Sequence, residues 1–160
     1  IGFSDAIKDS VGTYYPILKA QLDANPDYKI LVTGHSLGGA LAVLGGMDLT
    51  QRDKRITSSN LKIFTYGGPR VGNKAFANYV VNSKVPVFRS VNKSDPIPQS
   101  PPPTVGFVHP GVEAWKKVTG NVQICNTPLE SNQCSSSAGM FAFNMMDHMQ
   151  YYDIGMGTCM

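Results

Sequence analysis

The sequence has few charged side chains and no apolar run long enough to cross a membrane. Asp, Glu, Lys and Arg make up 16% of its 160 residues, against roughly 25% in an ordinary globular protein. The net charge is only +3 and the basic residues are scattered, so we expect no nucleic-acid partner. The stretch Leu37–Met47 is far shorter than the roughly 18 residues of a membrane span, and its glycines favour a buried helix.

The sequence also lacks an initiator methionine and a signal peptide, because it opens on Ile1-Gly2-Phe3. We therefore expect a processed or incomplete polypeptide. Its 160 residues suffice for one domain, and neither an internal repeat nor a linker divides them. The prediction is a single domain over residues 1–160 that lacks an N-terminal portion.

Cysteine is scarce, with three in the chain. Cys125 and Cys134 are nine positions apart in a polar segment, and this spacing allows a disulfide. Cys159 is then left over, which suggests a partner for it elsewhere. The alternative is three free thiols in a cytosolic protein. No C-x-x-C or H-x-x-x-H spacing occurs, so we expect no zinc site.

Gly34-His35-Ser36-Leu37-Gly38 is the most informative segment of the chain. It follows an apolar, β-branched run and precedes a run of small apolar residues, which predicts a strand, a sharp turn and a helix. Such a turn needs glycine on both sides of the serine, because the backbone is strained and the strand and helix pack closely. The pattern predicts that Ser36 is an exposed nucleophile at the end of a sheet.

Strands and helices are predicted to alternate along much of the chain. Apolar periodicity predicts helices over 4–23, 36–51, 74–82 and 144–153, and strands over 28–33, 61–66 and 85–91. Residues 97–103 carry four prolines and are expected to be irregular, whereas residues 105–124 resemble a hairpin. This order indicates an α/β fold with a mostly parallel sheet and flanking helices.

Two prolines bear on these predictions. Pro16 should kink or break the first helix, and Pro86 favours an early or edge position for its strand. Only three parallel strands are evident, and so few would leave an edge of the sheet open. We expect a further segment to cover the side that precedes residue 1.

A serine nucleophile needs a base, and the chain has three histidines. His148 follows the serine and the acid candidate in the order typical of α/β-hydrolases, so it is the preferred base. His109 lies at the turn of the predicted hairpin and is the alternative. His35 adjoins the serine and is interpreted as a packing or surface residue.

The acid should follow a later strand and precede the histidine. Asp95 meets both conditions, since it comes just after the predicted strand 85–91, whose end faces the same sheet edge as the serine. Asp147 is interpreted more simply as a helix N-cap. Asn92-Lys93-Ser94 is a formal glycosylation sequon, but beside the acid it is interpreted as a chance match.

The tetrahedral oxyanion of acyl transfer requires at least two donors. One is the backbone N–H of Leu37, directly after the nucleophile. The second donor usually comes from a loop after an early strand, and the chain has no such loop before residue 28. The predicted chemistry needs no cofactor and no metal.

Four stretches resemble the fungal class 3 lipases, the filamentous-fungal triacylglycerol lipase type of α/β-hydrolase. They begin with Pro26-Asp27-Tyr28-Lys29, which runs into Val32-Thr33-Gly34-His35-Ser36-Leu37-Gly38-Gly39-Ala40-Leu41-Ala42. The others are Tyr66-Gly67-Gly68-Pro69-Arg70-Val71-Gly72-Asn73, Phe88-Arg89 through Asp95-Pro96-Ile97-Pro98, and Asp147-His148-Met149-Gln150-Tyr151-Tyr152. The match spans nearly the whole chain but resembles only the C-terminal part of the family's domain.

The resemblance implies a carboxylic-ester hydrolase that acts on acylglycerols at an oil–water interface through Ser36, Asp95 and His148. It also implies secretion, a Cys125–Cys134 disulfide, and a disulfide that joins Cys159 to the N-terminal region. The family's N-terminal strands, lid helix and Ser/Thr of the oxyanion hole are missing here, so we expect them on a separate chain or outside this sequence. The alternatives are a feruloyl or other soluble-ester esterase and a non-catalytic lipid-binding relative.

Overall fold

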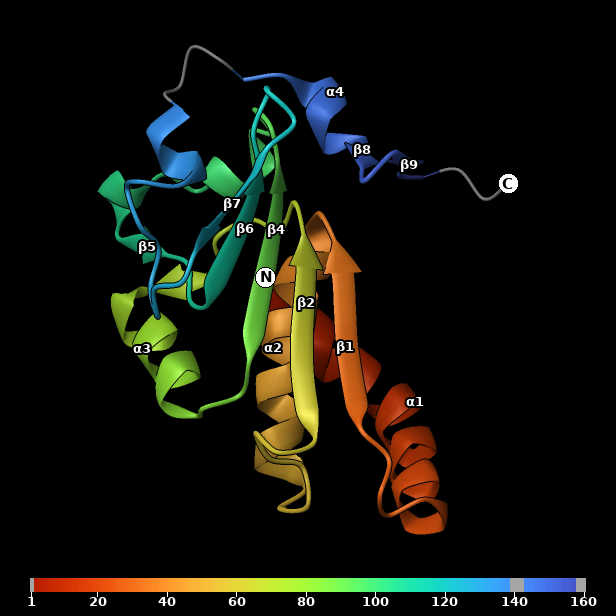
Figure 1. The fold of residues 1–160 in the computed structure, drawn as a ribbon. Helices are drawn as coiled ribbons and strands as arrows, with labels where there is room; N and C mark the ends of the chain where they lie inside the picture. The colour runs from red at the N-terminus through yellow and green to blue at the C-terminus, as the bar shows by residue number, and fades with distance from the viewer. Residues whose placement is uncertain (1, 139–142, 158–160) are drawn as a thin grey trace.

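The computed structural model describes residues 2–138 and 143–157 (Figure 1). Its central sheet has the strand order β1-β2-β4-β6-β7. β1, β2, β4 and β6 run parallel, and β7 is antiparallel to β6. The bounds of these strands are β1 Ile30–His35, β2 Leu61–Tyr66, β4 Val87–Asn92, β6 Val112–Lys116 and β7 Val122–Cys125.

Helices cover one face of this sheet. α2 packs against β1 and β2, and α1 packs against α2. The helices are α1 Phe3–Ala24, α2 Leu37–Arg52, α3 Lys74–Asn82 and the short α4 Met145–His148. Shorter elements complete the fold: β3 Gly72–Asn73, η1 Ile97–Gln99, η2 Pro103–Val105, β5 Phe107–Val108, η3 Ser135–Ala138, β8 Gln150–Tyr151 and β9 Ile154–Gly155.

The predicted α/β architecture is confirmed, with three corrections in its first half. α1 continues through Pro16 without a break, because packing of Tyr14 and Leu18 against the core supports both halves of the helix. The first strand begins at Ile30 rather than at residue 28. β4 is the middle strand of the sheet, and Pro86 precedes it rather than marking an edge.

The predicted hairpin conceals a fourth parallel strand. β6 forms a hairpin with β7, as expected, but its other edge pairs with β4. A charged residue such as Glu113 is not typical of a strand inside a parallel sheet, and yet Glu113 is only 2% exposed. Its carboxylate is 2.9 Å from Nη2 of Arg89 on β4 and accepts a hydrogen bond from the backbone N–H of Ser135. This buried ion pair is a tertiary contact that sequence periodicity does not show.

Two segments in the second half of the chain also differ from their predictions. The proline-rich stretch contains two 3-10 turns, η1 and η2, because Pro98 and Pro103 favour the required backbone angles. The predicted helix 144–153 is only four residues long. Positive φ angles at Tyr152 and Asp153 turn the chain into the β8–β9 hairpin instead.

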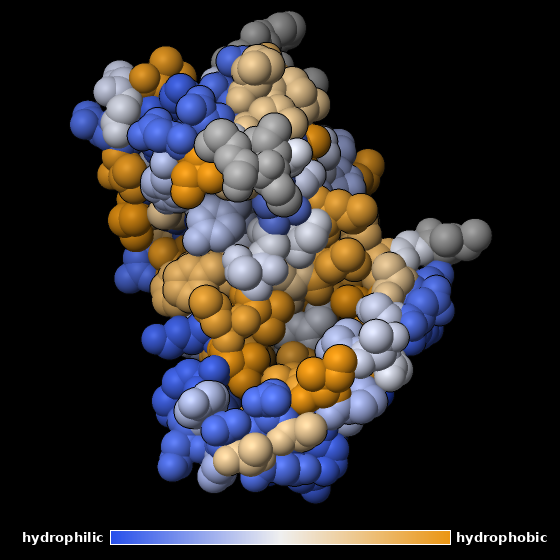
Figure 2. All heavy atoms as spheres, turned by 90° about the vertical axis from the view of Figure 1, so that its right-hand side faces the viewer, coloured by the Kyte–Doolittle hydropathy of each residue, from blue (hydrophilic) through white to orange (hydrophobic). Residues whose placement is uncertain are grey.

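The second face of the sheet carries exposed apolar side chains. Ile63 faces α2, because a Cβ added at Gly46 would lie 2.5 Å from its Cδ1 atom, so the next residue, Phe64, faces the other way. Phe64 stacks on Phe88 with ring centroids 4.8 Å apart. Leu31 on the edge strand β1 is 64% exposed. Seen from the side of β1 and α1, hydrophobic side chains gather across the middle of the molecule (Figure 2).

Among the described residues, no helix combines the length and apolar character that a membrane span requires.

Candidate active site

Ser36 lies in a strained turn between β1 and α2. Its φ and ψ are 57° and −129°, a combination that a residue with a side chain rarely adopts. The turn is tight because the strand and helix backbones nearly touch: a Cβ added at Gly34 would lie 2.0 Å from the carbonyl oxygen of Gly38. The backbone therefore requires glycine at position 34 and presents Ser36 at the carboxyl end of β1. The predicted need for glycine on both sides of Ser36 is wrong for Gly38, where an added Cβ would meet nothing within 4 Å.

A chain of hydrogen bonds connects Ser36, His148 and Asp95. Nδ1 of His148 is 2.9 Å from Oδ2 of Asp95, and Nε2 is 2.8 Å from Oγ of Ser36. A carboxylate only accepts, so the neutral ring carries its proton on Nδ1 and leaves Nε2 free to accept from the serine hydroxyl. Three residues separated by more than 50 positions each are thus brought together in the order required for nucleophilic activation.

The Asp95 carboxylate is 1% exposed and receives three hydrogen bonds. Besides His148, Tyr151 donates its hydroxyl to Oδ2 at 2.5 Å, and the backbone N–H of Ile97 donates to Oδ1 at 2.8 Å. Burial and the charge of Asp95 raise the pKa of Tyr151, so its hydroxyl remains a donor. These donors stabilise the ionised carboxylate in a buried place.

Gly67, at the end of β2, makes room for this arrangement. Its φ is +60°, and an added Cβ would lie 2.7 Å from Oδ2 of Asp95 and 3.0 Å from Nδ1 of His148. Gly67 therefore contributes no reacting group to the site. Its lack of a side chain leaves the room that Asp95 and His148 occupy.

His35 is the residue whose role was underestimated from the sequence. It is stacked on the His148 ring with centroids 4.5 Å apart, and its Nε2–H donates to the His148 backbone carbonyl at 2.9 Å. The interpretation as a packing residue holds, but the ring it packs against is the candidate base. The sequence signal for this contact was that His35 is next to Ser36. A residue at the end of β1 lies at the sheet edge where the segment around His148 also lies.

His109, the alternative base, lies elsewhere and is 3% exposed. Its Nε2–H donates to the carbonyl of Pro98 at 2.8 Å. Burial, together with the charges of Arg89 and Arg70, holds the pKa of His109 well below its usual value, so the ring remains neutral. Its position supports the loop that follows Asp95.

The predicted N-cap role of Asp147 is wrong, because Asn144 caps α4 by accepting from the Met146 backbone N–H. Asp147 instead accepts from the backbone N–H of Ser94 at 3.1 Å. Asn92 of the sequon is 4% exposed, and its amide bonds to the carbonyls of Asp147 and Gln150. The interpretation of the sequon as a chance match agrees with this burial.

Leu37 is the first residue of the 16-residue helix α2. The first N–H groups of a helix have no partner within it and carry the positive end of its dipole. The backbone N–H of Leu37, the predicted oxyanion donor, therefore lies at the positive end of α2, where a negative charge is stabilised.

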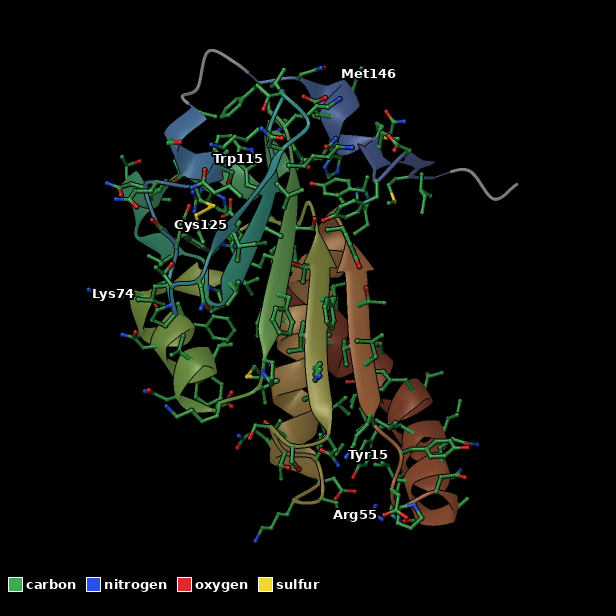
Figure 3. All side chains as sticks on the ribbon, viewed as in Figure 1. Tyr15, Arg55, Lys74, Trp115, Cys125 and Met146 are labelled. Atoms are coloured by element: carbon green, nitrogen blue, oxygen red, sulfur yellow. A yellow bond between two sulfur atoms is a disulfide. The ribbon has the colours of Figure 1, made fainter. Side chains whose placement is uncertain are left out.

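Cys125 and Cys134 form a disulfide (Figure 3). It ties the end of β7 to the segment that precedes η3. Cys159 lies outside the described residues.

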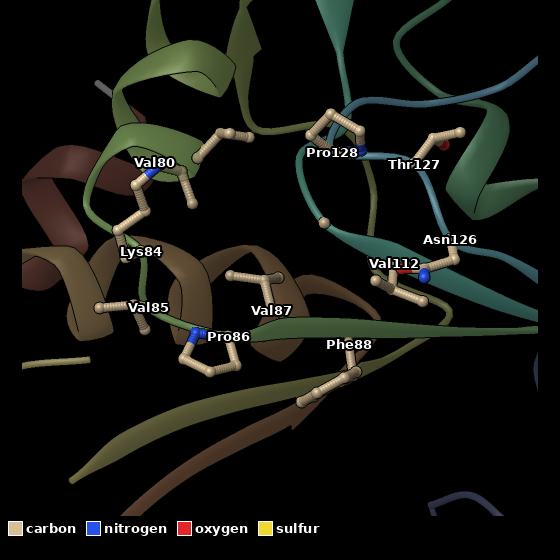
Figure 4. A pocket seen from close by; sticks show the side chains of 12 residues that line it. Val80, Lys84, Val85, Pro86, Val87, Phe88, Val112, Asn126, Thr127 and Pro128 are labelled. Atoms are coloured by element: carbon tan, nitrogen blue, oxygen red, sulfur yellow. The ribbon is translucent and has the colours of Figure 1, made fainter. Parts of the chain in front are cut away.

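A cavity of about 340 Å³ lies beside the first residues of β4, at the end of this strand that is away from Asp95 (Figure 4). Apolar side chains from the end of α3, the start of β4 and the start of β6 line most of it, including Val80, Val87 and Val112. Because Asp95 follows the other end of β4, this cavity is separate from the Ser36–His148–Asp95 group.

Comparisons with known proteins agree with this geometry. The family model described as lipase (class 3) matches residues 1–105. The chain belongs to the class 3 lipase family. A lipase of Rhizopus niveus is 50% identical over 160 residues, which are 99% of this chain and 41% of that protein. The solved structure of lipase II from Rhizopus niveus covers 99% of this chain and 60% of its own, with a TM-score of 0.95.

Two other relatives of this class 3 lipase chain are informative. A solved triacylglycerol lipase, described as having a serine protease triad as its catalytic centre, has a TM-score of 0.92 and 42% identity; the match covers 97% of this chain and 59% of its own. A secreted mono- and diacylglycerol lipase 1 of Fusarium solani is 31% identical across 99% of this chain and 47% of its own. The chain spans less than half the length of the curated relatives from Rhizopus niveus and Fusarium solani. The similarity to the solved lipases shows that its fold is that of the α/β-hydrolases.

Proposed function

We propose that this chain carries the catalytic centre of a serine carboxylic-ester hydrolase that acts on acylglycerols. The observation that carries the proposal is the hydrogen-bond chain from Ser36 through His148 to Asp95, at 2.8 and 2.9 Å. The solved triacylglycerol lipase relative, with its serine protease triad, supports the same roles. Residues 1–160 would form part of one lipase domain.

Each group has a defined role in the proposed reaction. Ser36 Oγ attacks the ester carbonyl while His148 Nε2 takes the hydroxyl proton, and Asp95 stabilises the imidazolium that forms. The Leu37 backbone N–H binds the oxyanion. The imidazolium then protonates the departing alcohol, which leaves an acyl-enzyme on Ser36. Water, activated by His148, attacks the acyl-enzyme and releases the fatty acid.

We further propose that an N-terminal polypeptide segment completes the domain, either as a separate chain or as part of a longer one. Support comes from the apolar face around Leu31, Phe64 and Phe88, since parallel sheets are normally covered on both faces. It also comes from the outer edge of β1, which pairs with no other strand among the described residues. This segment would supply the lid and the second oxyanion donor. A disulfide through Cys159 would be one way to link it.

The protein is proposed to be secreted. The Cys125–Cys134 disulfide favours an oxidising compartment, and the Fusarium solani relative is named as secreted. That relative's name also indicates partial glycerides, so preference among mono-, di- and triacylglycerols is a matter for direct assay. A soluble-ester esterase would use the same residues, and it would prefer a dissolved ester over an emulsion.

The test is fluorophosphonate labelling and ester hydrolysis by the complete protein, with and without Ser36→Ala. We expect labelling at Ser36, and a loss of about 10⁴-fold or more in kcat for the variant, because removal of a triad member leaves only residual catalysis. Ser58→Ala, in an exposed turn, is the matched control and should retain full activity. Labelling at another residue, or none in the folded protein, would refute the proposal.

A further inference from the structure

Asn92, the last residue of β4, uses both hydrogens of its side-chain amide on the segment that carries His148. Its Nδ2 is 3.0 Å from the carbonyl oxygen of Asp147 and 2.7 Å from that of Gln150. A carbonyl oxygen can only accept, so both contacts are donations and the orientation of the amide is determined. The side chain is enclosed, with 4% exposure.

The two carbonyls lie on either side of His148, one residue before it and two residues after it. Tyr151, which is 1% exposed, provides most of the apolar burial in this segment, because Met145, Met146 and Met149 are 54%, 72% and 44% exposed. Met146 is on the outer side of α4, away from the sheet (Figure 3). The two carbonyls bound by Asn92 therefore share the restraint on the His148 ring with the buried Tyr151 and with the stacked His35.

Asn92 also contacts the acid side of the site. Its backbone N–H donates to the Tyr151 hydroxyl at 3.3 Å, and that hydroxyl donates to Asp95 Oδ2 at 2.5 Å. One residue thus restrains the backbone around the base and the hydroxyl that supports the acid.

We propose that Asn92 is a positioning residue for the reaction, one that sets the His148 ring against Ser36 and Asp95 through the carbonyls of Asp147 and Gln150. This inference rests on the proposed function and assigns a role to a residue outside the triad. A displacement of about 1 Å in a reacting group can cost on the order of 100-fold in rate. Loss of the amide should therefore lower kcat, whereas substrate binding should change little, because Asn92 is only 4% exposed.

The test compares Asn92→Asp and Asn92→Ser with wild type in the complete protein. Asn92→Asp keeps the shape but turns an acceptor toward two carbonyls, and Asn92→Ser removes the reach of the amide. A phosphonate titrant counts the competent Ser36 sites, so that misfolded protein does not enter kcat. We expect kcat per titrated site to fall about 10- to 100-fold, with KM within about twofold of wild type.

Asn82→Asp, at the exposed end of α3, makes the same chemical change far from the site and should leave kcat and KM unchanged. An unchanged kcat per titrated site in both Asn92 variants would overturn the inference, even if their yield or melting temperature falls. So would a rise in KM with kcat preserved. Failure of the proposed function looks different, because wild type itself would then neither hydrolyse ester nor label at Ser36.

Discussion

The proposed nucleophile, Ser36, and the proposed base, His148, are held by different kinds of structure. Ser36 lies between β1 and α2, two long elements whose backbones are in contact at Gly34 and Gly38. His148 ends a four-residue helix and is followed by a two-residue strand. Hydrogen bonds from Asn92 and Ser94 hold that segment in place.

The two sides of the site are rigid for different reasons. The nucleophile is positioned by steric exclusion within one strand–turn–helix unit, so its geometry is local and insensitive to pH. The base and the acid are positioned by buried polar contacts between segments far apart in the chain. Buried polar contacts are costly when one partner is removed, so this side should respond to single-atom changes and to protonation.

Gly34→Ala should have the largest effect, because it breaks the nucleophile side. The new Cβ would lie 2.0 Å from the Gly38 carbonyl oxygen, a backbone atom that cannot move aside without separating β1 from α2. We expect the free energy of unfolding to fall by at least about 3 kcal/mol, as overpacking of this severity does. Urea denaturation monitored by circular dichroism measures it.

Gly38→Ala is the matched control for that change. A Cβ at Gly38 meets nothing within 4 Å, and alanine favours a helix over glycine by roughly 1 kcal/mol. Its stability should therefore be equal to or above that of wild type. Equal losses in the two variants would show that the close approach is not what determines the turn.

Tyr151→Phe tests the buried polar contacts around Asp95 and His148, because it removes the hydroxyl that donates to Asp95. The Asp95 carboxylate would lose a hydrogen bond from a neutral donor to a charged acceptor, an interaction of about 1.5–3 kcal/mol. We expect kcat of the complete protein to fall about tenfold, since a less stabilised carboxylate supports the imidazolium less well. Steady-state kinetics on a dissolved ester provides the measurement.

Tyr152→Phe is its neighbour and control. That hydroxyl contacts the Ser90 hydroxyl at 2.7 Å, without a charged partner, and Tyr152 is 46% exposed. Its removal should change kcat less than twofold. A similar fall in both variants would mean that the bond to Asp95 has no special role.

Acidification should lower the free energy of unfolding through His109, whose ring supports the loop after Asp95. Its pKa is lowered in the folded state by burial, whereas in the unfolded chain it is near 6.5. Below about pH 6.5 the unfolded chain therefore binds a proton that the folded protein excludes, and stability falls as the pH falls, by up to about 1.4 kcal/mol per pH unit. Thermal unfolding between pH 7.5 and 5 measures this slope.

His109→Gln removes the titrating ring and can still donate a hydrogen bond. Its stability should be lower at neutral pH but should depend less on pH between 6.5 and 5. A slope as steep as that of wild type would assign the acid sensitivity to other groups.

The sequence predicted well wherever local chemistry dictates local geometry. Glycines around Ser36 indicated the turn, and the order of Asp95 and His148 selected the two residues that the fold brings to Ser36. β2 and α3 begin and end where periodicity predicted them. The sequence predicted the β6–β7 hairpin but not the pairing of β6 with β4, because the ion pair of Glu113 with Arg89 forms only across the sheet.

Local patterns predicted the strand–turn–helix unit and the three candidate groups Ser36, Asp95 and His148, because steric limits on glycine and the order of segments act along the chain. Three contacts come from the folded arrangement alone: His35 stacks on His148, Gly67 leaves space beside Asp95, and Asn92 binds the backbone around His148. Those contacts join residues 28 to 113 positions apart, and their energies depend on burial, which no local pattern records.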